Sequence, residues 1–263
     1  MDPTRSDTPH RTYDALLAEA QQRRAAFRES PLPKIHIGMA TCGIASGALE
    51  TRQAFQEALA EQGLEAQIHS VGCMGHCYAE PVVIIEGPGF PAILYHQVTP
   101  GKARMLVRSF LGDGDPLFEH ILGATEENDM IPWVKDFPRF NREKRVVSER
   151  CGRIDPEDIY EYLAEGGYGG LVKALSMEPE QVLGLVRDSG LRGRGGAGFP
   201  TGPKWDLARR AKGSRKTVIC NADEGDPGAY MDRTILESNP HQVLEGIAVC
   251  AYSVGAQRAT VYV

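Results

Sequence analysis

The sequence predicts an α/β protein with two domains, and three observations support this fold class. The chain has 263 residues, whereas a single domain has roughly 150. Hydrophobic residues make up 42% and charged residues 24% of the chain, a balance that can bury a core and that excludes disorder as the main state. Stretches with strand alternation follow stretches with helical spacing, which is typical of α/β folds.

The N-terminal segment, residues 1–33, is predicted to be a single helix followed by a short stretch that ends it. Residues 12–29 are rich in Ala, Gln, Glu and Arg. The segment 30–33, Ser-Pro-Leu-Pro, ends this helix because its prolines disfavour helical backbone. One side of the helix carries its apolar residues: Leu16, Leu17, Ala20 and Phe27.

Residues 34–112 are predicted to form a small α/β domain with the element order β-α-β-β-β-α. The strands are expected at 34–39, 65–71, 81–86 and 92–98, the helices at 47–63 and 102–111, and a loop at 40–46. Gly63 is expected to end the first of these helices, because glycine is the residue that most readily closes a helix C-terminus.

Residues 113–150 are interpreted as a connecting arm. The Gly-Asp-Gly-Asp-Pro run at 112–116 is typical of a linker, and the residues after it show weak periodicity and end in a charged stretch. A solvated helix face followed by a loop is the alternative.

A second α/β unit is predicted over residues 151–263. Helices are expected at 156–165, 170–175, 178–188, from about 204, and at 240–254, with strands at 216–220 and 258–263. The chain stops on the last strand, so we expect this domain to be incomplete and its parent protein to be longer.

Composition excludes several classes of function. The net charge of −6 gives no basic footprint for nucleic acid. No apolar run reaches about 18 residues, so we expect no direct membrane insertion. The N-terminus lacks the apolar region of a secretory signal, which predicts a cytoplasmic protein. Six cysteines in such a chain indicate thiolate chemistry or metal binding before disulfides.

Three cysteines follow two of the predicted strands. Cys42 comes after the first strand of residues 34–112, and Cys73 and Cys77 come after the second. If these strands pair in parallel, both loops emerge at one edge of the sheet and the thiolates converge. Soft thiolates select zinc or iron–sulfur clusters. Two alternatives remain open: small buried cysteines, and a zinc site that adds His76 or His69.

A glycine-rich loop lies at residues 193–198. Its letters match G-x-G-x-x-G, but a predicted helix rather than a strand precedes it, which argues against a dinucleotide-binding Rossmann loop. Glycine-rich backbone still lets N–H groups approach an anion, and a helix N-terminus follows. Cations and aromatic rings stand nearby: Arg192, Arg194, Lys204, Phe199 and Trp205. These parts suit a planar phosphorylated cofactor; a tight structural turn is the alternative.

A second polar loop follows the strand predicted at residues 216–220. It carries Asn221, Asp223, Glu224 and Asp226. In α/β sheets ligand groups gather at such strand ends, where carboxylates accept hydrogen bonds from ribose hydroxyls or ring N–H groups. A Mg²⁺ or Ca²⁺ site and a solvated turn are the alternatives.

Two long motifs carry a family resemblance. LRGRGGAGFPTGPKW at 191–205 and CNADEGDPGAYMDR at 220–233 resemble the flavin-binding, NADH-oxidising subunit of respiratory complex I, NAD-linked hydrogenases and formate dehydrogenases. Residues 34–112 resemble the thioredoxin-like [2Fe-2S] ferredoxins, which use Cys-x4-Cys and then Cys-x3-Cys. The fused arrangement is most similar to electron-bifurcating hydrogenases.

The resemblance implies a site for FMN and NAD(H). FMN would be held by Gly193, Gly195, Gly196 and Lys204, with Asn221, Asp223 and Glu224 lining the flavin pocket. NADH would stack on the flavin, with Phe199 near its adenine end and Asp226 near its ribose. The family commonly has Glu where this chain has Asp226, and often an aromatic residue where it has Leu207. No residue is assigned as a catalytic acid or base.

The resemblance also implies a [2Fe-2S] cluster on Cys42, Cys73 and Cys77. Gly47 stands where the family has its remaining cysteine, so Ser46 or a neighbouring side chain is the candidate fourth ligand. A [4Fe-4S] site is expected only in a longer parent, because Cys151, Cys220 and Cys250 are isolated and are interpreted as structural.

The implied function is that of an NADH:acceptor oxidoreductase (diaphorase) subunit. It would pass electrons between NAD(H), FMN and iron–sulfur clusters, with other subunits of a redox complex, including iron–sulfur proteins, as partners. The alternatives are a non-catalytic electron-transfer module and a zinc-binding structural module.

Overall fold

The computed structural model describes residues 4–138, 140–213 and 215–263. The chain divides into two compact units. The five-stranded unit comprises Phe27–Asp158 and Thr234–Asn239, and the two-stranded unit comprises Ile159–Arg233, Pro240–Val263 and the N-terminal residues up to Ala26.

The N-terminal helix α1 spans Thr4–Glu29, so the predicted helix is confirmed and begins earlier than expected. In the two-stranded unit, Arg24 forms an ion pair with Glu165, and Arg23 lies 3.7 Å from the ring centre of Tyr160. These contacts hold α1 against α5 (Ile159–Ala164). Across the described residues, neither α1 nor any other helix is long and apolar enough to cross a membrane.

The five-stranded sheet has the strand order β2-β1-β3-β4-β5. Its strands are β1 (Lys34–Gly38), β2 (Gln67–Val71), β3 (Val83–Glu86), β4 (Ile93–Tyr95) and β5 (Ile121–Ala124). The first two run parallel, and β3 runs antiparallel to both of its neighbours. This topology is thioredoxin-like, and it confirms the predicted α/β fold class.

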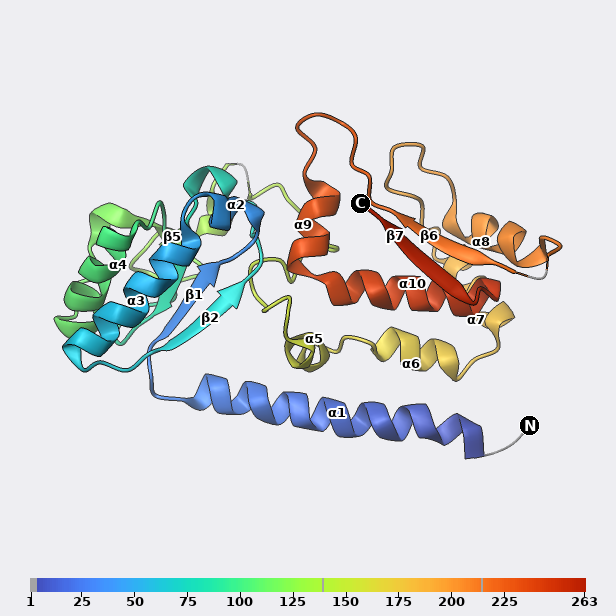
Figure 1. Cartoon of the computed structure of the whole chain (residues 1–263), viewed down its shortest axis with the longest axis horizontal. Coiled ribbons are helices and arrows are strands. Elements are labelled where there is room, and N and C mark those ends of the chain that lie inside the picture. The colour runs from blue at the N-terminus through green and yellow to red at the C-terminus, as the bar shows by residue number, and fades with distance from the viewer. Residues whose placement is uncertain (1–3, 139, 214) are drawn as a thin grey trace. The chain divides into compact units, whose positions relative to one another are not determined.

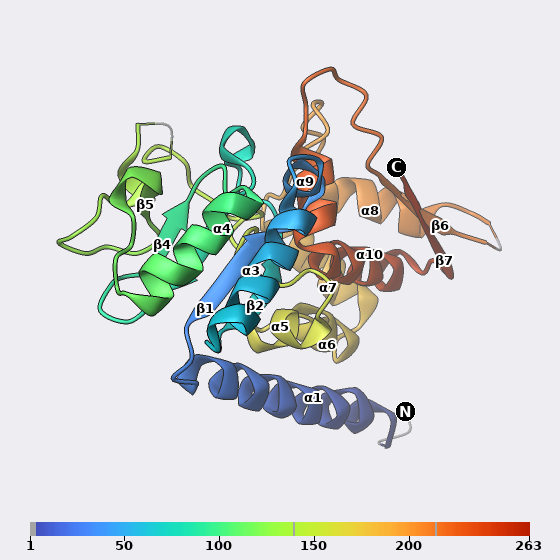
Figure 2. The ribbon, with the colours of Figure 1, turned by 60° about the vertical axis from the view of Figure 1, so that its left-hand side comes forward.

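Two helices cover one face of this sheet. Figure 2 shows α3 (Ala48–Gln62) and α4 (Pro100–Leu106) lying side by side, and α4 continues as a π-helical turn over Val107–Gly112. Gly63 caps the C-terminus of α3 with a φ of 62°, which confirms the helix end predicted at this glycine. The core beneath is fully buried and mixes strand and helix side chains: Ile35, Ile37, Phe55, Ile85 and Phe110.

Two segments differ from the expectations. The prediction of a loop at 40–46 is wrong, because a short helix, α2 (Thr41–Ala45), follows β1. Five residues are too few to show a helical period. Within the segment expected as a connecting arm, β5 pairs with β4 and extends the sheet, with a register shift at Leu94/Tyr95. Its apolar run is too short to stand out as a strand.

A carboxylate on β3, Glu86, lies close to two basic side chains on β1. His36 Nε2 lies 3.0 Å from a carboxylate oxygen of Glu86, and Lys34 Nζ lies 3.4 Å from the other. The hydrogen bond with His36 is the main cause that holds the pKa of Glu86 below its ordinary value of 4.5; burial opposes it and the nearby Lys34 charge supports it.

We expect Glu86→Gln to lower stability at neutral pH but not in acid. A carboxyl group with a lowered pKa in the folded state stabilises that state above its unfolded pKa, and the contribution disappears as the pH falls through the folded pKa. Urea-unfolding midpoints of the parent and Glu86→Gln should therefore differ at about pH 6.5 and converge near about pH 3. A difference that stays constant between these two pH values would contradict the ion-pair assignment.

The two-stranded unit is mainly helical. Its helices beyond α5 are α6 (Gly169–Leu175), α7 (Pro179–Asp188), α8 (Thr201–Arg210), α9 (Met231–Ser238), which runs on into the five-stranded unit, and α10 (Pro240–Val254). Its strands β6 (Thr217–Asn221) and β7 (Arg258–Tyr262) pair in parallel (Figure 1). Helix α9 was not predicted, because its first residues continue a Gly- and Asp-rich loop.

Close packing joins α7 to α8 in this unit. A Cβ atom on Gly202 would lie 2.4 Å from the Cα atom of Arg187. Glycine at this position therefore sets how closely the two helices approach. At the other end of α7, Glu178 and Gln181 form a capping box that fixes the start of the helix.

Candidate functional site

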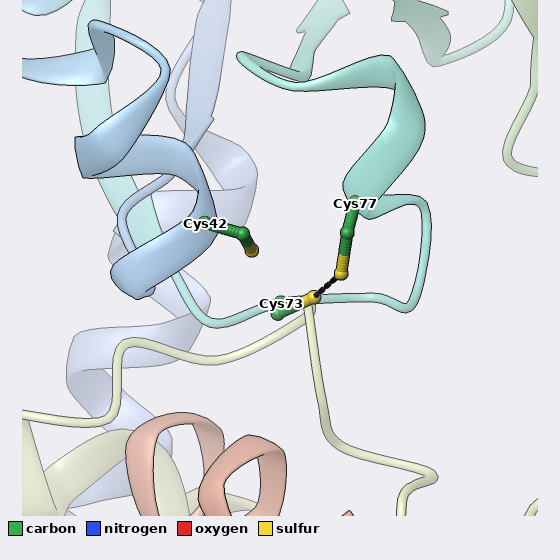
Figure 3. A group of neighbouring side chains, drawn as sticks. All are labelled: Cys42, Cys73 and Cys77. Carbon is green, nitrogen blue, oxygen red and sulfur yellow. Dashed lines mark hydrogen bonds between the residues drawn. The ribbon is translucent and has the colours of Figure 1, made fainter. Parts of the chain in front are cut away.

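Three cysteines meet at one edge of the five-stranded sheet. Cys42 lies in α2, Cys73 in the loop after β2, and Cys77 at the start of the 3₁₀ turn Cys77–Ala79 (Figure 3). Their sulfur atoms all lie within 4.8 Å of one another, and the sulfurs of Cys73 and Cys77 are 3.5 Å apart. The convergence predicted from parallel pairing of β1 and β2 is confirmed.

The loop that carries Cys73 is fixed by contacts on both sides. Its backbone N–H donates to Ser238 Oγ at 2.9 Å, and the N–H of Gly75 lies 3.3 Å from the Cys73 sulfur. A Cβ atom on Gly72 would lie 2.3 Å from the Cβ atom of Ser238, so only glycine allows this approach. A backbone N–H that donates to a ligating sulfur orients the thiolate and tunes the metal that it binds.

The end of α9 closes the other side of the cysteine group. The backbone N–H of Thr41 donates to the carboxylate of Glu237 at 2.9 Å, and its hydroxyl donates to the same carboxylate. Neither Ser238 nor Glu237 could be predicted from the sequence, because both contacts join residues far apart in the chain.

In the absence of a cation, the thiols of Cys42 and Cys77 favour the protonated state. The pKa of Cys42 is raised, first by its hydrogen bond with Cys73 and then by burial. Burial also raises the pKa of Cys77. A metal ion reverses this preference, because ligation requires thiolates and releases their protons.

The donor set fits a thiolate-bound metal. Two thiolates on one tetrahedral ion, each about 2.3 Å from it, lie about 3.8 Å apart, close to the observed sulfur separation. Among the described residues no histidine or carboxylate joins the three thiols in so tight a group. His69 instead faces His36, with their Nδ1 atoms 3.1 Å apart, and the ring of His76 packs on Phe140. The structure thus brings neither histidine into the cluster.

The glycine-rich loop of the two-stranded unit folds back on itself. The N–H of Gly193 donates to the carbonyl of Phe199 at 2.9 Å, and the N–H of Thr201 donates to the carbonyl of Leu191 at 2.9 Å. Gly196 and Gly198 have φ values of 106° and 61°, which L side chains rarely adopt. The glycines are therefore needed for the shape of the loop.

The tip of this loop is free to bind an anion. In the described part of the chain, the N–H groups of residues 194–198 donate no hydrogen bond to protein. Arg194 and Lys204 are exposed, and α8 starts directly after the loop without a side-chain cap at Pro200. Unbonded N–H groups, a helix N-terminus and cations are the features that hold phosphate, so the loop fits a phosphorylated cofactor.

In the acidic loop after β6, some side chains hydrogen-bond to the backbone and others are exposed. The Asn221 side-chain oxygen accepts from the N–H of Asp223 at 3.2 Å. The Glu224 carboxylate accepts from the N–H groups of Asp232 and Arg233 at 2.8 and 3.0 Å, so it caps α9. Asp223 and Asp226 are exposed. Both loops rise on the same side of the unit (Figure 1).

The cap determines the charge state of Glu224. Burial alone would raise its pKa, but the backbone N–H groups of Arg233, Asp232 and Met231 outweigh burial and hold the pKa below its ordinary value. Glu224 is therefore ionised at neutral pH, and its assignment to the flavin pocket remains a prediction, like that of the other site residues.

Comparison with known proteins gives one family match and several similar relatives. Residues 186–263 match the family model described as the Nuo51 FMN-binding domain. The NADP-reducing hydrogenase subunit HndC of Solidesulfovibrio fructosivorans is 53% identical over 122 residues, covering 46% of this chain and 25% of that protein. The NAD-reducing hydrogenase HoxS subunit alpha of Cupriavidus necator is 36% identical over 191 residues, covering 72% of this chain and 29% of that protein.

Solved structures match the chain over different lengths. The thioredoxin-like [2Fe-2S] ferredoxin of Aquifex aeolicus matches 35% of this chain and 98% of its own, with 22% identity and a TM-score of 0.31. An NAD⁺-reducing [NiFe]-hydrogenase matches 100% of this chain and 44% of its own, with 22% identity and a TM-score of 0.36. The chain spans about a quarter of the length of the curated relatives it matches. The resemblance stated from the sequence motifs is confirmed.

Proposed function

We propose, from the match of residues 186–263 to the Nuo51 FMN-binding domain, that this chain is part of an NADH:acceptor oxidoreductase subunit. The observation that carries the proposal is the glycine-rich loop, whose unbonded N–H groups lie within the matched segment. The subunit would work in a multisubunit redox complex such as a hydrogenase, a formate dehydrogenase or complex I, with iron–sulfur proteins as partners.

FMN would bind between the two loops of the two-stranded unit. The backbone of Gly193, Gly195 and Gly196 approaches its phosphate closely, and Lys204 supplies a cation. Asn221, Asp223 and Glu224 line the flavin side. When bound, FMN would supply hydride acceptance from NADH and one-electron release, chemistry that the protein itself lacks.

NADH would take the exposed side of the same site. Phe199 is 52% exposed and offers a ring face for the adenine end. The exposed carboxylate of Asp226 accepts hydrogen bonds from ribose hydroxyls. The protein contributes position and electrostatics, and no side chain is needed as a general acid or base.

The five-stranded unit would receive electrons through a [2Fe-2S] cluster on Cys42, Cys73 and Cys77. A group of thiols this close favours a reducing compartment, because oxidising compartments convert such groups to disulfides. We therefore place the protein in the cytoplasm.

A second candidate is a zinc-binding structural module, which the three-thiol group also supports. Metal analysis separates the two, since stoichiometric zinc without iron would favour the structural site. A non-catalytic electron-transfer module would hold a cluster but bind no nucleotide.

The proposal is tested by flavin binding and its reduction. We expect the protein to bind FMN, to show a flavin spectrum, and to lose its visible flavin absorbance when NADH is added. Lys204→Ala should weaken FMN binding roughly 10- to 100-fold, because a charge-assisted hydrogen bond contributes about 1.5–3 kcal/mol. Titration by flavin fluorescence measures the change.

Lys212→Ala is the matched control, because Lys212 is also exposed but lies beyond the end of α8. Its FMN affinity should equal that of the parent. Equal losses in both variants would show that only general charge matters, and no FMN binding by the parent would overturn the proposed function.

A further inference from the structure

The cysteine group lacks one ligand. A [2Fe-2S] cluster takes four protein ligands, two on each iron, and this chain offers three thiols. Gly47 occupies the position of the missing cysteine and has a φ of 99°, so it contributes only its backbone. The fourth ligand must therefore come from elsewhere in the fold.

Glu80 is a buried carboxylate beside this group. It is 7% exposed, and its Oε1 lies 3.5 Å from the Cys42 sulfur. Its Oε2 accepts a hydrogen bond from the N–H of Val82 at 2.8 Å. Among the described residues no Lys, Arg or His side chain forms an ion pair with it. A buried carboxylate without a cation is costly, unless a metal supplies the positive charge.

Two glycines leave room for this carboxylate. Cβ atoms built on Gly38 and on Gly43 would each lie 3.2 Å from Glu80 Oε2. Larger residues at these positions would crowd the carboxylate and displace it from Cys42. The backbone around β1 and α2 is thus shaped to admit Glu80 next to the thiol.

The distances form two pairs. A sulfur at about 2.3 Å and an oxygen at about 2.1 Å from one tetrahedral ion lie about 3.6 Å apart. The Cys42–Glu80 pair, at 3.5 Å, has this spacing, and the Cys73–Cys77 pair is also 3.5 Å apart. Glu80 is not part of the tight group of three thiols, and its carboxylate adds a donor on the Cys42 side of that group.

We propose that Glu80 is the fourth ligand of the cluster, completing a three-thiolate, one-carboxylate set in which Cys42 and Glu80 bind one iron and Cys73 and Cys77 bind the other. A carboxylate carries the same charge as the thiolate it replaces, so the total ligand charge is unchanged. The inference rests on the proposed function for the identity of the metal centre.

Ser46 is the rival ligand. It is exposed and forms the C-cap of α2. Its neutral hydroxyl would have to lose a proton before it could replace a thiolate in charge. Glu80 needs no such change once a cation is present.

The test compares Glu80→Gln, Glu80→Cys and Ser46→Ala in the full chain. Each variant is reconstituted without oxygen from ferrous iron and sulfide, then desalted and challenged with a chelator. Glu80→Gln keeps the side-chain volume and an oxygen for the Val82 N–H, so it tests ligation rather than folding. Circular dichroism checks that each variant is folded.

We expect Glu80→Gln to bind iron at least about ten-fold more weakly, since even the loss of an outer contact costs about 10–100-fold. Glu80→Cys should restore retention with altered g values in electron paramagnetic resonance, and Ser46→Ala should match the parent. Unchanged iron retention and g values in Glu80→Gln would overturn the assignment.

The same samples separate this inference from the proposed function. FMN binding is measured on each by flavin fluorescence. A parent chain that binds FMN and takes up zinc but no iron would overturn the Glu80 proposal alone. A parent that forms the cluster but binds no FMN would overturn the proposed function and leave Glu80 as a ligand.

Discussion

Cys73→Ser is expected to abolish stable metal binding, with a loss of affinity of at least about 100-fold. Its thiol is central to the group, 3.5 Å from the Cys77 sulfur and 3.3 Å from the backbone N–H of Gly75. The residue is only 2% exposed, so water cannot easily take the place of the lost ligand. A serine hydroxyl is a hard, neutral donor, and iron–sulfur clusters and zinc bind it less well than a thiolate.

Iron, zinc and sulfide analysis after anaerobic reconstitution measures this loss. Cys220→Ser is the matched control, because Cys220 is a half-buried thiol on β6 outside the group. The control should keep the metal content of the parent. If Cys73→Ser retains metal at the parental ratio, Cys73 is a buried cysteine without a ligand role.

Gly202→Ala should destabilise the two-stranded unit by about 1–2 kcal/mol. Alanine in a helix gains about 0.5–1 kcal/mol over glycine, but overpacking costs about 1–3 kcal/mol and sometimes more. Here the added Cβ atom would lie 2.4 Å from the Cα atom of Arg187. Backbone cannot move aside as a flexible side chain can, so α7 and α8 must separate.

Gly184→Ala is the opposite case in the same pair of helices. Its Cβ atom would meet only the tip of the Arg187 side chain, at 3.9 Å. We expect it to stabilise the unit by about 0.5–1 kcal/mol. Thermal and urea unfolding of both variants measure the two signs, and equal shifts in one direction would refute the packing argument.

Much of the fold was predictable because its elements carry local signals. The strand 34–39 and the helix 47–63 have clear periodicity, and Gly63 marks a helix end. The short helix α2 and the strand β5 have five and four residues, too few for a period to show. They form because neighbouring segments pair with them.

The candidate site likewise has features that the sequence predicts and features that it does not. The convergence of Cys42, Cys73 and Cys77 followed from parallel strand pairing, which is a rule of topology. The contacts that place Glu80 and Ser238 beside the thiols could not be foreseen, because they join residues with no recognisable spacing in the sequence. Glu224 matched a motif, but the structure shows that its carboxylate caps α9.

The hydrogen bond from Cys73 to Ser238 has a consequence for synthesis of the chain on the ribosome. The two residues are 165 positions apart, so the thiols emerge well before the residue that fixes their loop. At about 5–20 residues per second, this interval lasts roughly 8–33 s. During that time the cysteines lie in a nascent chain without one wall of their site. We therefore expect insertion of the proposed cluster to follow translation of residue 238, and a ribosome-stalled chain ending before α9 to hold iron poorly.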